Sequence, residues 1–260
     1  VQIVKNEART AREIKYFDLL PQLLASCLMY LLVIQAGINM SFASVLISQL
    51  ADGNEIKIDT NTASIISSIY TIALPFGGII SGILIDKFGR KKIGLLICLP
   101  FCFAWILIGT AKDINSIYAA RVLAGFISGL TTASVVYAAE VSYKSFRSAL
   151  LCMNSVWVSF GIFSTYVLNY FHLSWRLIGW IYAATSLLSL LLIFLVPESP
   201  HWLLYFNRKS SEEKKLQQLK KCISWLYRNP EVSIFFGNLP TFYFSFCKFI
   251  LRLLLPNLMI

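Results

Sequence analysis

Long stretches without a charged side chain dominate this chain. Six follow one another, at residues 19–51, 60–85, 93–111, 122–139, 148–175 and 177–197. Each reaches the roughly 18 residues that an α-helix needs to cross the hydrocarbon core of a membrane. Strands of a membrane barrel would be about ten residues long and would alternate in polarity. The pattern therefore predicts an all-α integral membrane protein with six transmembrane helices.

The predicted helices form one bundle behind a polar tail. We place them at about 21–45, 62–85, 91–111, 115–139, 148–171 and 176–197. Because the loops between them are short, the helices must pack together as a single six-helix bundle over residues 21–200. Residues 1–20 are mixed and charged, and form the tail that precedes this bundle.

The segment at 201–230 turns polar and predicts an amphipathic cytoplasmic helix. Ser210 and Glu213 have the spacing of a capping box. Apolar residues then recur at helical spacing, at Leu216, Leu219, Ile223 and Leu226. Such a stripe favours docking on the bundle over a free, solvated helix.

The last residues, 231–260, stay unassigned. They are apolar but include Lys248 and Arg252. A seventh membrane segment, a hairpin and an aberrant or truncated sequence all fit this composition.

The net charge is +10, and its distribution predicts the topology. Lys and Arg gather before the first predicted helix and after the second, fourth and sixth. On the opposite side they occur at Lys57, Lys112, Arg121 and Arg176. Basic residues favour the cytoplasmic side, so we expect a multi-pass protein of the plasma membrane with a cytoplasmic N-terminus. The protein is then embedded in the lipid bilayer. Because the topology accounts for the excess of basic residues, no nucleic acid is needed as a partner.

Constellations of catalytic or metal-binding residues are absent from the sequence. Cys98 and Cys102 lie one helical turn apart, but no His or acid lies near them. His172 and His201 fall at predicted membrane edges. No nucleophile–base pair, metal-ligand spacing or phosphate-binding loop occurs. We therefore expect no enzyme, no metal and no cofactor.

Small residues predict close contacts between helices. Gly78 and Gly82 form a GxxxG pair in the second predicted helix, and Gly125 and Gly129 form one in the fourth. This spacing lets helix backbones approach closely in lipid. We expect these four glycines to serve packing within the bundle.

Charged residues gather at the predicted cytoplasmic ends of the helices. Asp86, Glu140 and Glu198 end the second, fourth and sixth helices. A carboxylate at a helix C-terminus opposes the helix dipole, so these acids need basic partners. The basic residues of the same layer are Arg90, Lys91, Lys92 and Arg147.

Four motifs occur in order along the chain. They are Gly82-x-x-x-Asp86-Lys87-x-Gly89-Arg90-Lys91, Arg121-x-x-x-Gly125-x-x-x-Gly129, Tyr137-x-x-Glu140-x-Ser142 with Arg147, and Pro197-Glu198-Ser199-Pro200 with Trp202-Leu203. Together they resemble the sugar porter family of the major facilitator superfamily, over roughly residues 20–229. The end of the first helix, SFASVLISQL at 41–50, is most similar to insect trehalose and hexose facilitators.

The resemblance implies a fold and a mechanism. Two six-helix bundles would rock around a central sugar site and expose it to each side in turn. This chain would be the N-terminal bundle, with a C-terminal six-helix half expected in the full-length protein. The charged layer would latch the two bundles together when the outside is open. Its residues here are Asp86, Arg90, Lys91, Glu140, Arg147 and Glu198.

The resemblance also implies candidate sugar ligands. Gln35 and Asn39 match the family's motif in the first helix, and amides both donate and accept hydrogen bonds to hydroxyls. Ser155, next to Asn154, stands at the position where many members carry a sugar-binding Gln, so it is a departure from the family's pattern. Hydrogen bonds between helices are the alternative role for such amides.

The function implied is facilitated diffusion of a small-molecule sugar, trehalose or a hexose, with this half inactive alone. The first predicted helix lacks the Asp that proton-coupled members often carry, which favours diffusion over symport. His201 replaces the Arg usual after the last motif. An organic ion transporter is the alternative within the superfamily, although the external loop at about 50–61 is short for one. A truncated, non-transporting membrane protein is the third hypothesis.

Overall fold

The computed structural model describes residues 16–52, 59–143, 146–205 and 212–226. The helices are α2 (Tyr16–Asp52), α3 (Thr60–Phe88), α4 (Arg90–Thr110), α5 (Ile114–Leu130), α6 (Thr132–Val141), α7 (Arg147–Tyr170), α8 (Trp175–Phe194), α9 (Pro200–Tyr205) and α10 (Glu212–Leu226). Six stretches are long and apolar enough to cross a membrane, with α5 and α6 together forming the fourth. The prediction of six transmembrane helices is therefore confirmed.

The fourth span is interrupted at Thr131, which the sequence analysis did not anticipate. The hydroxyl of Thr131 donates to the carbonyl of Ser128 at 2.7 Å, and that of Thr132 donates to the carbonyl of Gly129 at 2.8 Å. Hydroxyls that bond to preceding carbonyls compete with the helical ladder and bend helices. Two consecutive threonines therefore account for the division into α5 and α6.

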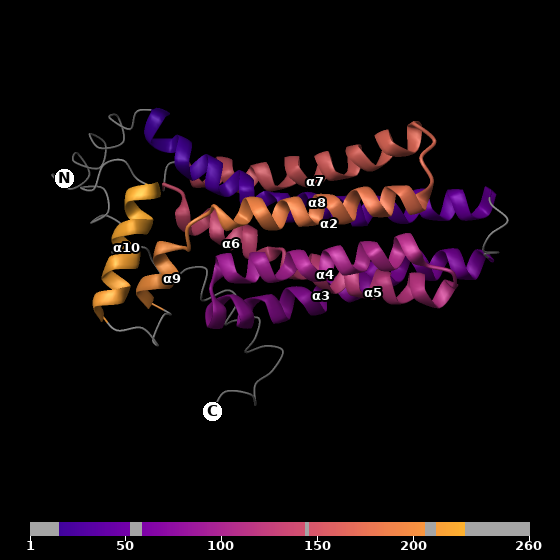
Figure 1. Cartoon of the computed structure of the whole chain (residues 1–260), viewed down its shortest axis with the longest axis horizontal. Coiled ribbons are helices and arrows are strands. Elements are labelled where there is room, and N and C mark those ends of the chain that lie inside the picture. The colour runs from indigo at the N-terminus through magenta and orange to yellow at the C-terminus, as the bar shows by residue number, and fades with distance from the viewer. Residues whose placement is uncertain (1–15, 53–58, 144–145, 206–211, 227–260) are drawn as a thin grey trace, which may run out of the picture.

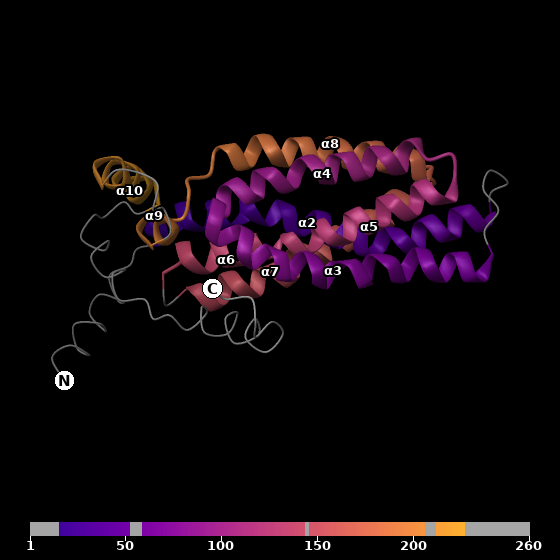
Figure 2. The ribbon, with the colours of Figure 1, turned by 90° about the horizontal axis from the view of Figure 1, so that it is seen from below.

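The helices run along one long axis, with α9 and α10 at one end (Figure 1). Figure 2 shows α4 and α8 on one side of the bundle and α3 and α7 on the other. The main helix pairs are α3 with α5, α2 with α7 and α4 with α8. Large buried side chains such as Tyr30, Phe42 and Trp105 fill the space between the pairs.

Glycine decides how closely α3 and α5 approach. A Cβ on Gly125 would collide with the carbonyl oxygen of Tyr70, and one on Gly129 would collide with that of Leu74. In α3, the glycine under the same constraint is Gly77, whose Cβ would meet the backbone of Phe126. A Cβ on Gly78 would meet nothing within 4 Å. The backbone N of Gly78 nevertheless lies 2.5 Å from where a Cβ on Gly129 would be, so Gly78 takes part in the contact through its backbone, while Gly77 is the α3 glycine whose own Cβ would collide.

Gly82, the other glycine of that predicted pair, is half-buried in α3. The nearby Ser81 is buried, and its hydroxyl donates to the carbonyl of Leu130 at 3.4 Å. The α3–α5 contact therefore extends along the span to the start of the Thr131 interruption.

The helices α9 and α10 lie across the end of the bundle (Figure 1). Trp202 and Leu203 of α9 and Cys222 and Leu226 of α10 are buried in the same hydrophobic cluster as residues of α2, α4 and α6. The capping box at Ser210 and Glu213, the tail before residue 16 and the segment at 231–260 lie outside the part of the chain whose side chains are described.

Candidate functional site

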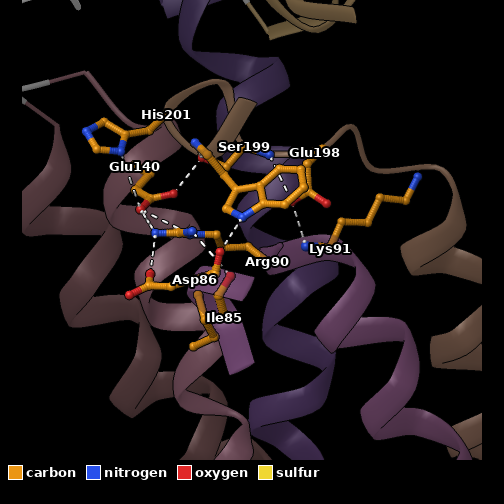
Figure 3. Close-up of polar contacts among 9 residues, drawn as sticks. Ile85, Asp86, Arg90, Lys91, Glu140, Glu198, Ser199 and His201 are labelled. Carbon is orange, nitrogen blue, oxygen red and sulfur yellow. Dashed lines mark hydrogen bonds and ion pairs between the residues drawn. The ribbon is translucent and has the colours of Figure 1, made fainter. Parts of the chain in front are cut away.

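Arg90 forms the centre of a polar cluster at the α9 end of the bundle (Figure 3). Its side chain is 2% exposed, and its Nη2 lies 2.6 Å from Oε1 of Glu140. Its Nε donates to the same oxygen at 3.1 Å, and its Nη1 donates to the carbonyl of Ile85 at 3.3 Å. Asp86, one turn earlier, lies 3.5 Å from Nη2. A guanidinium can satisfy several acceptors at once because its donors are fixed in a plane.

The second oxygen of Glu140 bonds to the segment after α8. The hydroxyl of Ser199 donates to Oε2 at 2.5 Å. His201 approaches from the same segment, with its Nδ1 at 3.9 Å from Oε1 of Glu140. Burial lowers the pKa of His201, while the charge of Glu140 opposes this effect. Glu140 therefore joins α6 to α4 on one side and to the α8–α9 connection on the other.

The carboxylate of Glu198 accepts hydrogen bonds from two backbone N–H groups, one of them at the start of α4. Its Oε1 accepts the N–H of Lys91, in the first turn of α4, at 2.9 Å, and the N–H of Ser199 at 3.2 Å. Burial raises the pKa of Glu198, and the hydrogen bonds from the backbone oppose that rise. A carboxylate at a helix N-terminus is favourable. The sequence-based argument that Glu198 opposes a dipole is wrong, because its carboxylate reaches α4 rather than its own helix α8.

The turn between α3 and α4 is a single glycine. Gly89 has φ 101°, a left-handed value that favours glycine. A Cβ at this position would lie 2.7 Å from Oε2 of Glu198. Trp202 closes the turn from outside, since its indole N–H donates to the carbonyl of Asp86 at 3.0 Å. The turn, Glu198 and α9 thus hold one another in place.

Two of the predicted latch residues have a different placement from the others. The ammonium of Lys91 donates to the carbonyl of Phe194 at 2.9 Å, and Figure 3 shows its side chain extending away from the acids. Arg147 begins α7, and its buried Nε has no hydrogen-bond partner among the described residues. The structure therefore brings together Asp86, Arg90 and Glu140, and holds Glu198 beside them through the backbone of Lys91.

The predicted sugar ligands on α2 lie inside the bundle. Gln35 is 2% exposed. Its amide nitrogen donates to the hydroxyl of Thr185 at 2.8 Å, and its Oε1 accepts the indole N–H of Trp105 at 3.1 Å. Asn39 is 1% exposed and donates to the carbonyl of Gln35 at 2.9 Å. Gln35 thus makes the hydrogen bonds between helices that the sequence analysis kept as the alternative.

Arg121 is a fully buried cation in the bundle interior. The sequence analysis named it as the first position of the Arg121-x-x-x-Gly125-x-x-x-Gly129 motif. Its Nη1 donates to the carbonyl of Asn39 at 2.9 Å, and its Nε donates to the carbonyl of Ile66 at 3.5 Å. Its guanidinium carbon lies 5.0 Å from the centre of the Tyr70 ring. Ionisable residues inside a membrane are costly and mark functional regions. Arg121 ties α5 to both α2 and α3.

The predicted ligands on α7 lie nearer to the surface. Asn154 is half-buried, and its Oδ1 has no hydrogen-bond partner among the described residues. Ser155 is exposed. Further exposed hydroxyls of α7 and α3 lie in the same spans, at Ser159, Ser67, Ser68 and Thr71. The opposite side, made by α4 and α8, exposes apolar residues in its middle, such as Leu96, Leu99 and Leu187. Both sides expose large apolar residues, including Ile72 on α3 and Phe163 on α7. The side of α3 and α7 differs in adding exposed hydroxyls in the middle of its spans.

Sequence reasoning overlooked Ser199 as a contact of Glu140, and it singled out His201 only as the residue that replaces the family's usual Arg beside the latch. Both lie in or beside the Pro197–Pro200 motif, so the motif itself was the available signal. Their contact with Glu140 depends on how the chain folds back after α8. No local pattern along the sequence gives that geometry.

Solved structures with the same fold include a bacterial xylose transporter. The chain is similar to the xylose transporter XylE from E. coli, solved in a partially occluded inward open conformation, with a TM-score of 0.66 and 20% sequence identity. The match covers 79% of this chain and 56% of that chain. At this identity, the likeness shows the fold.

Curated relatives come from animals, plants and bacteria. The facilitated trehalose transporter Tret1 of Anopheles gambiae is 29% identical over 202 residues, which are 76% of this chain and 25% of that protein. The sugar transporter ERD6-like 6 of Arabidopsis thaliana is 29% identical over 188 residues, 72% of this chain and 38% of that protein. The chain thus spans well under half of the length of these relatives.

The family model described as "Sugar (and other) transporter" matches residues 25–227. These residues include most of α2, all of α3 to α10, the polar cluster and Arg121. The chain therefore belongs to the sugar transporter family.

Proposed function

We propose that this chain is the N-terminal half of a facilitator that moves trehalose or a hexose across the plasma membrane by alternating access. The observation that carries the proposal is the difference between the two sides of the bundle. Exposed hydroxyls on α3 and α7 suit a sugar path shared with a second half, whereas the apolar side of α4 and α8 suits lipid.

The sugar contacts of this half are assigned to α7 and its surroundings. Asn154 has a buried Oδ1 that lacks a hydrogen-bond partner among the described residues, and Ser155 is exposed one position further along. An amide and a hydroxyl can donate to and accept from sugar hydroxyls. Gln35 acts from behind, because its hydrogen bonds to Thr185 and Trp105 fix α2 against α8 and α4. The Oδ1 of Asn39 also lacks a hydrogen-bond partner among the described residues, so Asn39 is kept as a sugar contact.

The polar cluster acts as one side of a latch. Arg90 and Glu140 form its permanent pair, and Asp86 stands at its edge with 38% of its side chain exposed. An exposed carboxylate is available to a basic group on a second bundle. Exposed pairs contribute about 0–1 kcal/mol each, so a few of them bias a two-state equilibrium without locking it.

Transport by diffusion fits the surroundings of Arg121. The guanidinium bonds to backbone carbonyls of Asn39 and Ile66 and lies over the ring of Tyr70. These partners do not release a proton in the physiological range. With a neutral Asn39 beside the cation, we assign no proton coupling to this half.

Uptake of radiolabelled sugars into proteoliposomes tests the proposal. The protein is the product of the complete transcript that contains this chain, oriented with its N-terminus in the cytoplasm in cells. Trehalose, glucose and xylose are compared, with and without an imposed proton gradient. Saturable uptake of trehalose or glucose at the same rate with and without the proton gradient supports the proposal. Uptake that requires the gradient, or that is absent for all three sugars, contradicts it.

A further inference from the structure

A pocket of about 1060 Å³ opens where α3 and α4 meet α9 and α10. It lies beside the turn at Gly89 and is distinct from the hydroxyl-bearing side of α3 and α7. Four lysines line it, at Lys87, Lys91, Lys92 and Lys221. The other polar and aromatic residues of its wall include Asp86, Glu198, Gln218, Trp202 and Trp225.

Two acids, Asp86 and Glu198, line the pocket together with the four lysines, and the charge of Glu198 acts on Lys91. Oε1 of Glu198 accepts a hydrogen bond from the backbone N–H of Lys91. Oδ1 of Asp86 lies 3.5 Å from Nη2 of Arg90. No ion pair joins any of the four lysines to an acid among the described residues. The ammonium of Lys92 lies 5.7 Å from the centre of the Trp202 ring, and Lys221 is exposed on α10. Among the described residues, the lining therefore carries four lysines against two acids, an excess of positive charge.

The pocket continues into the apolar side of the bundle. Leu95, Leu195 and Val196 belong to its lining. Next to them, α4 and α8 expose Leu96 and Leu191, 56% and 66% exposed. This side lacks exposed hydroxyls in the middle of its spans, and lipid chains would cover it. A molecule with an anionic head and apolar chains matches both parts of this surface.

We infer that the pocket binds the phosphate-bearing headgroup of an anionic phospholipid, with its acyl chains along α4 and α8. Basic pockets between membrane helices are suited to such headgroups. Tryptophan side chains are favoured at the membrane–water interface, and two of them, Trp202 and Trp225, line the pocket. A bound headgroup would bridge α4 to α10 and hold α10 on the bundle. The inference does not depend on which solute the protein transports.

Spin-labelled phosphatidylserine in phosphatidylcholine vesicles provides the test. The full 260-residue chain is reconstituted, and electron paramagnetic resonance gives the immobilised lipid fraction, with spin-labelled phosphatidylcholine as reference. We expect preferential immobilisation of phosphatidylserine. Each lysine near a membrane surface is worth about fivefold in affinity, so Lys87→Gln with Lys92→Gln and Lys221→Gln should weaken the preference by more than tenfold.

Lys112→Gln is the matched control, because Lys112 is an exposed lysine at the opposite end of the bundle. Equal helicity by circular dichroism is required of all variants before they are compared. An equal loss with Lys112→Gln, or no preference for phosphatidylserine in the unmodified protein, would overturn the inference. Displacement of the labelled lipid by inorganic phosphate at comparable concentration would show a site for a free anion and would overturn the lipid assignment.

Discussion

The carboxylate of Glu198 caps a helix other than the one it follows. It comes four residues after the end of α8, yet its Oε1 accepts the N–H of Lys91 at 2.9 Å in the first turn of α4. Gly89 makes this contact possible, because any Cβ there would meet the other carboxylate oxygen. The turn after α3 and the segment after α8 therefore depend on each other.

Substitution of Glu198 tests that dependence. Because burial raises the pKa of Glu198, its contribution to stability is greatest when the group is protonated and falls as the pH rises through the raised pKa. Glu198→Gln keeps an acceptor without the charge and should change the free energy of unfolding by less than about 1 kcal/mol. Glu198→Ala leaves the N–H of Lys91 unpaired and should cost about 1–2 kcal/mol.

Thermal unfolding of the purified chain in detergent measures both variants. Equal melting temperatures for Glu198→Ala and Glu198→Gln would show that the cap does not hold α4.

Gly77 and Gly78 are neighbours with opposite expected responses. A Cβ on Gly77 collides with the backbone of Phe126, so Gly77→Ala should force α3 and α5 apart and cost about 1–3 kcal/mol. A Cβ on Gly78 meets nothing within 4 Å, so Gly78→Ala should be neutral or stabilising by up to about 1 kcal/mol. Melting curves of the two variants decide the matter, and a larger loss for Gly78→Ala would refute the α3–α5 packing.

The Arg90–Glu140 pair should behave as a unit. Arg90 is buried and Glu140 is 14% exposed, so removal of one partner leaves the other charge poorly solvated. Arg90→Gln should destabilise the chain by about 3 kcal/mol. Adding Glu140→Gln should recover part of that loss, with a coupling energy of about 1–3 kcal/mol.

A double-mutant cycle on unfolding free energies measures the coupling of this pair. Strictly additive losses would mean that the 2.6 Å contact contributes nothing specific.

His201 gives the cluster a pH dependence. Burial lowers its pKa, so the folded protein takes up this proton less readily than the unfolded chain. Its contribution to stability is complete above about pH 6.5 and is lost as the pH falls through the lowered pKa. Acidification from about pH 7.5 to about pH 5.5 should therefore lower the melting temperature more in the unmodified chain than in His201→Gln.

Glu198 responds in the opposite sense, because its pKa is raised. The comparison between the unmodified chain and His201→Gln cancels that contribution. A melting temperature that falls equally in both proteins would exclude His201 as the group responsible.

The apolar runs predicted the number and order of the spans, because a helix that crosses a membrane must be apolar along its own length. The interruption at Thr131 escaped prediction, since threonines inside helices also bond to carbonyls without breaking the ladder. Asp86, Arg90 and Glu140 were predicted as one layer from their positions at helix ends. The partner of Glu198 was not predictable, because it depends on where the chain after α8 meets the α3–α4 turn.

The interior was also beyond the reach of the sequence. Gln35 and Asn154 are both polar residues in apolar spans, and nothing local separates one from the other. The rotation of each helix makes Gln35 a buried link to Trp105 and Thr185, while Ser155, next to Asn154, faces outward. Side-chain direction in a bundle follows from packing with all neighbours.

Sugar uptake by two forms of the protein tests the central claim most directly. The first form is the 260-residue chain alone, and the second is the product of the complete transcript that contains it. Both are reconstituted in vesicles with radiolabelled trehalose and glucose. We predict saturable uptake by the second form and uptake no faster than that of empty vesicles by the first. Saturable uptake by the 260-residue chain alone, or by neither form, would contradict the claim that this bundle is one half of a sugar path.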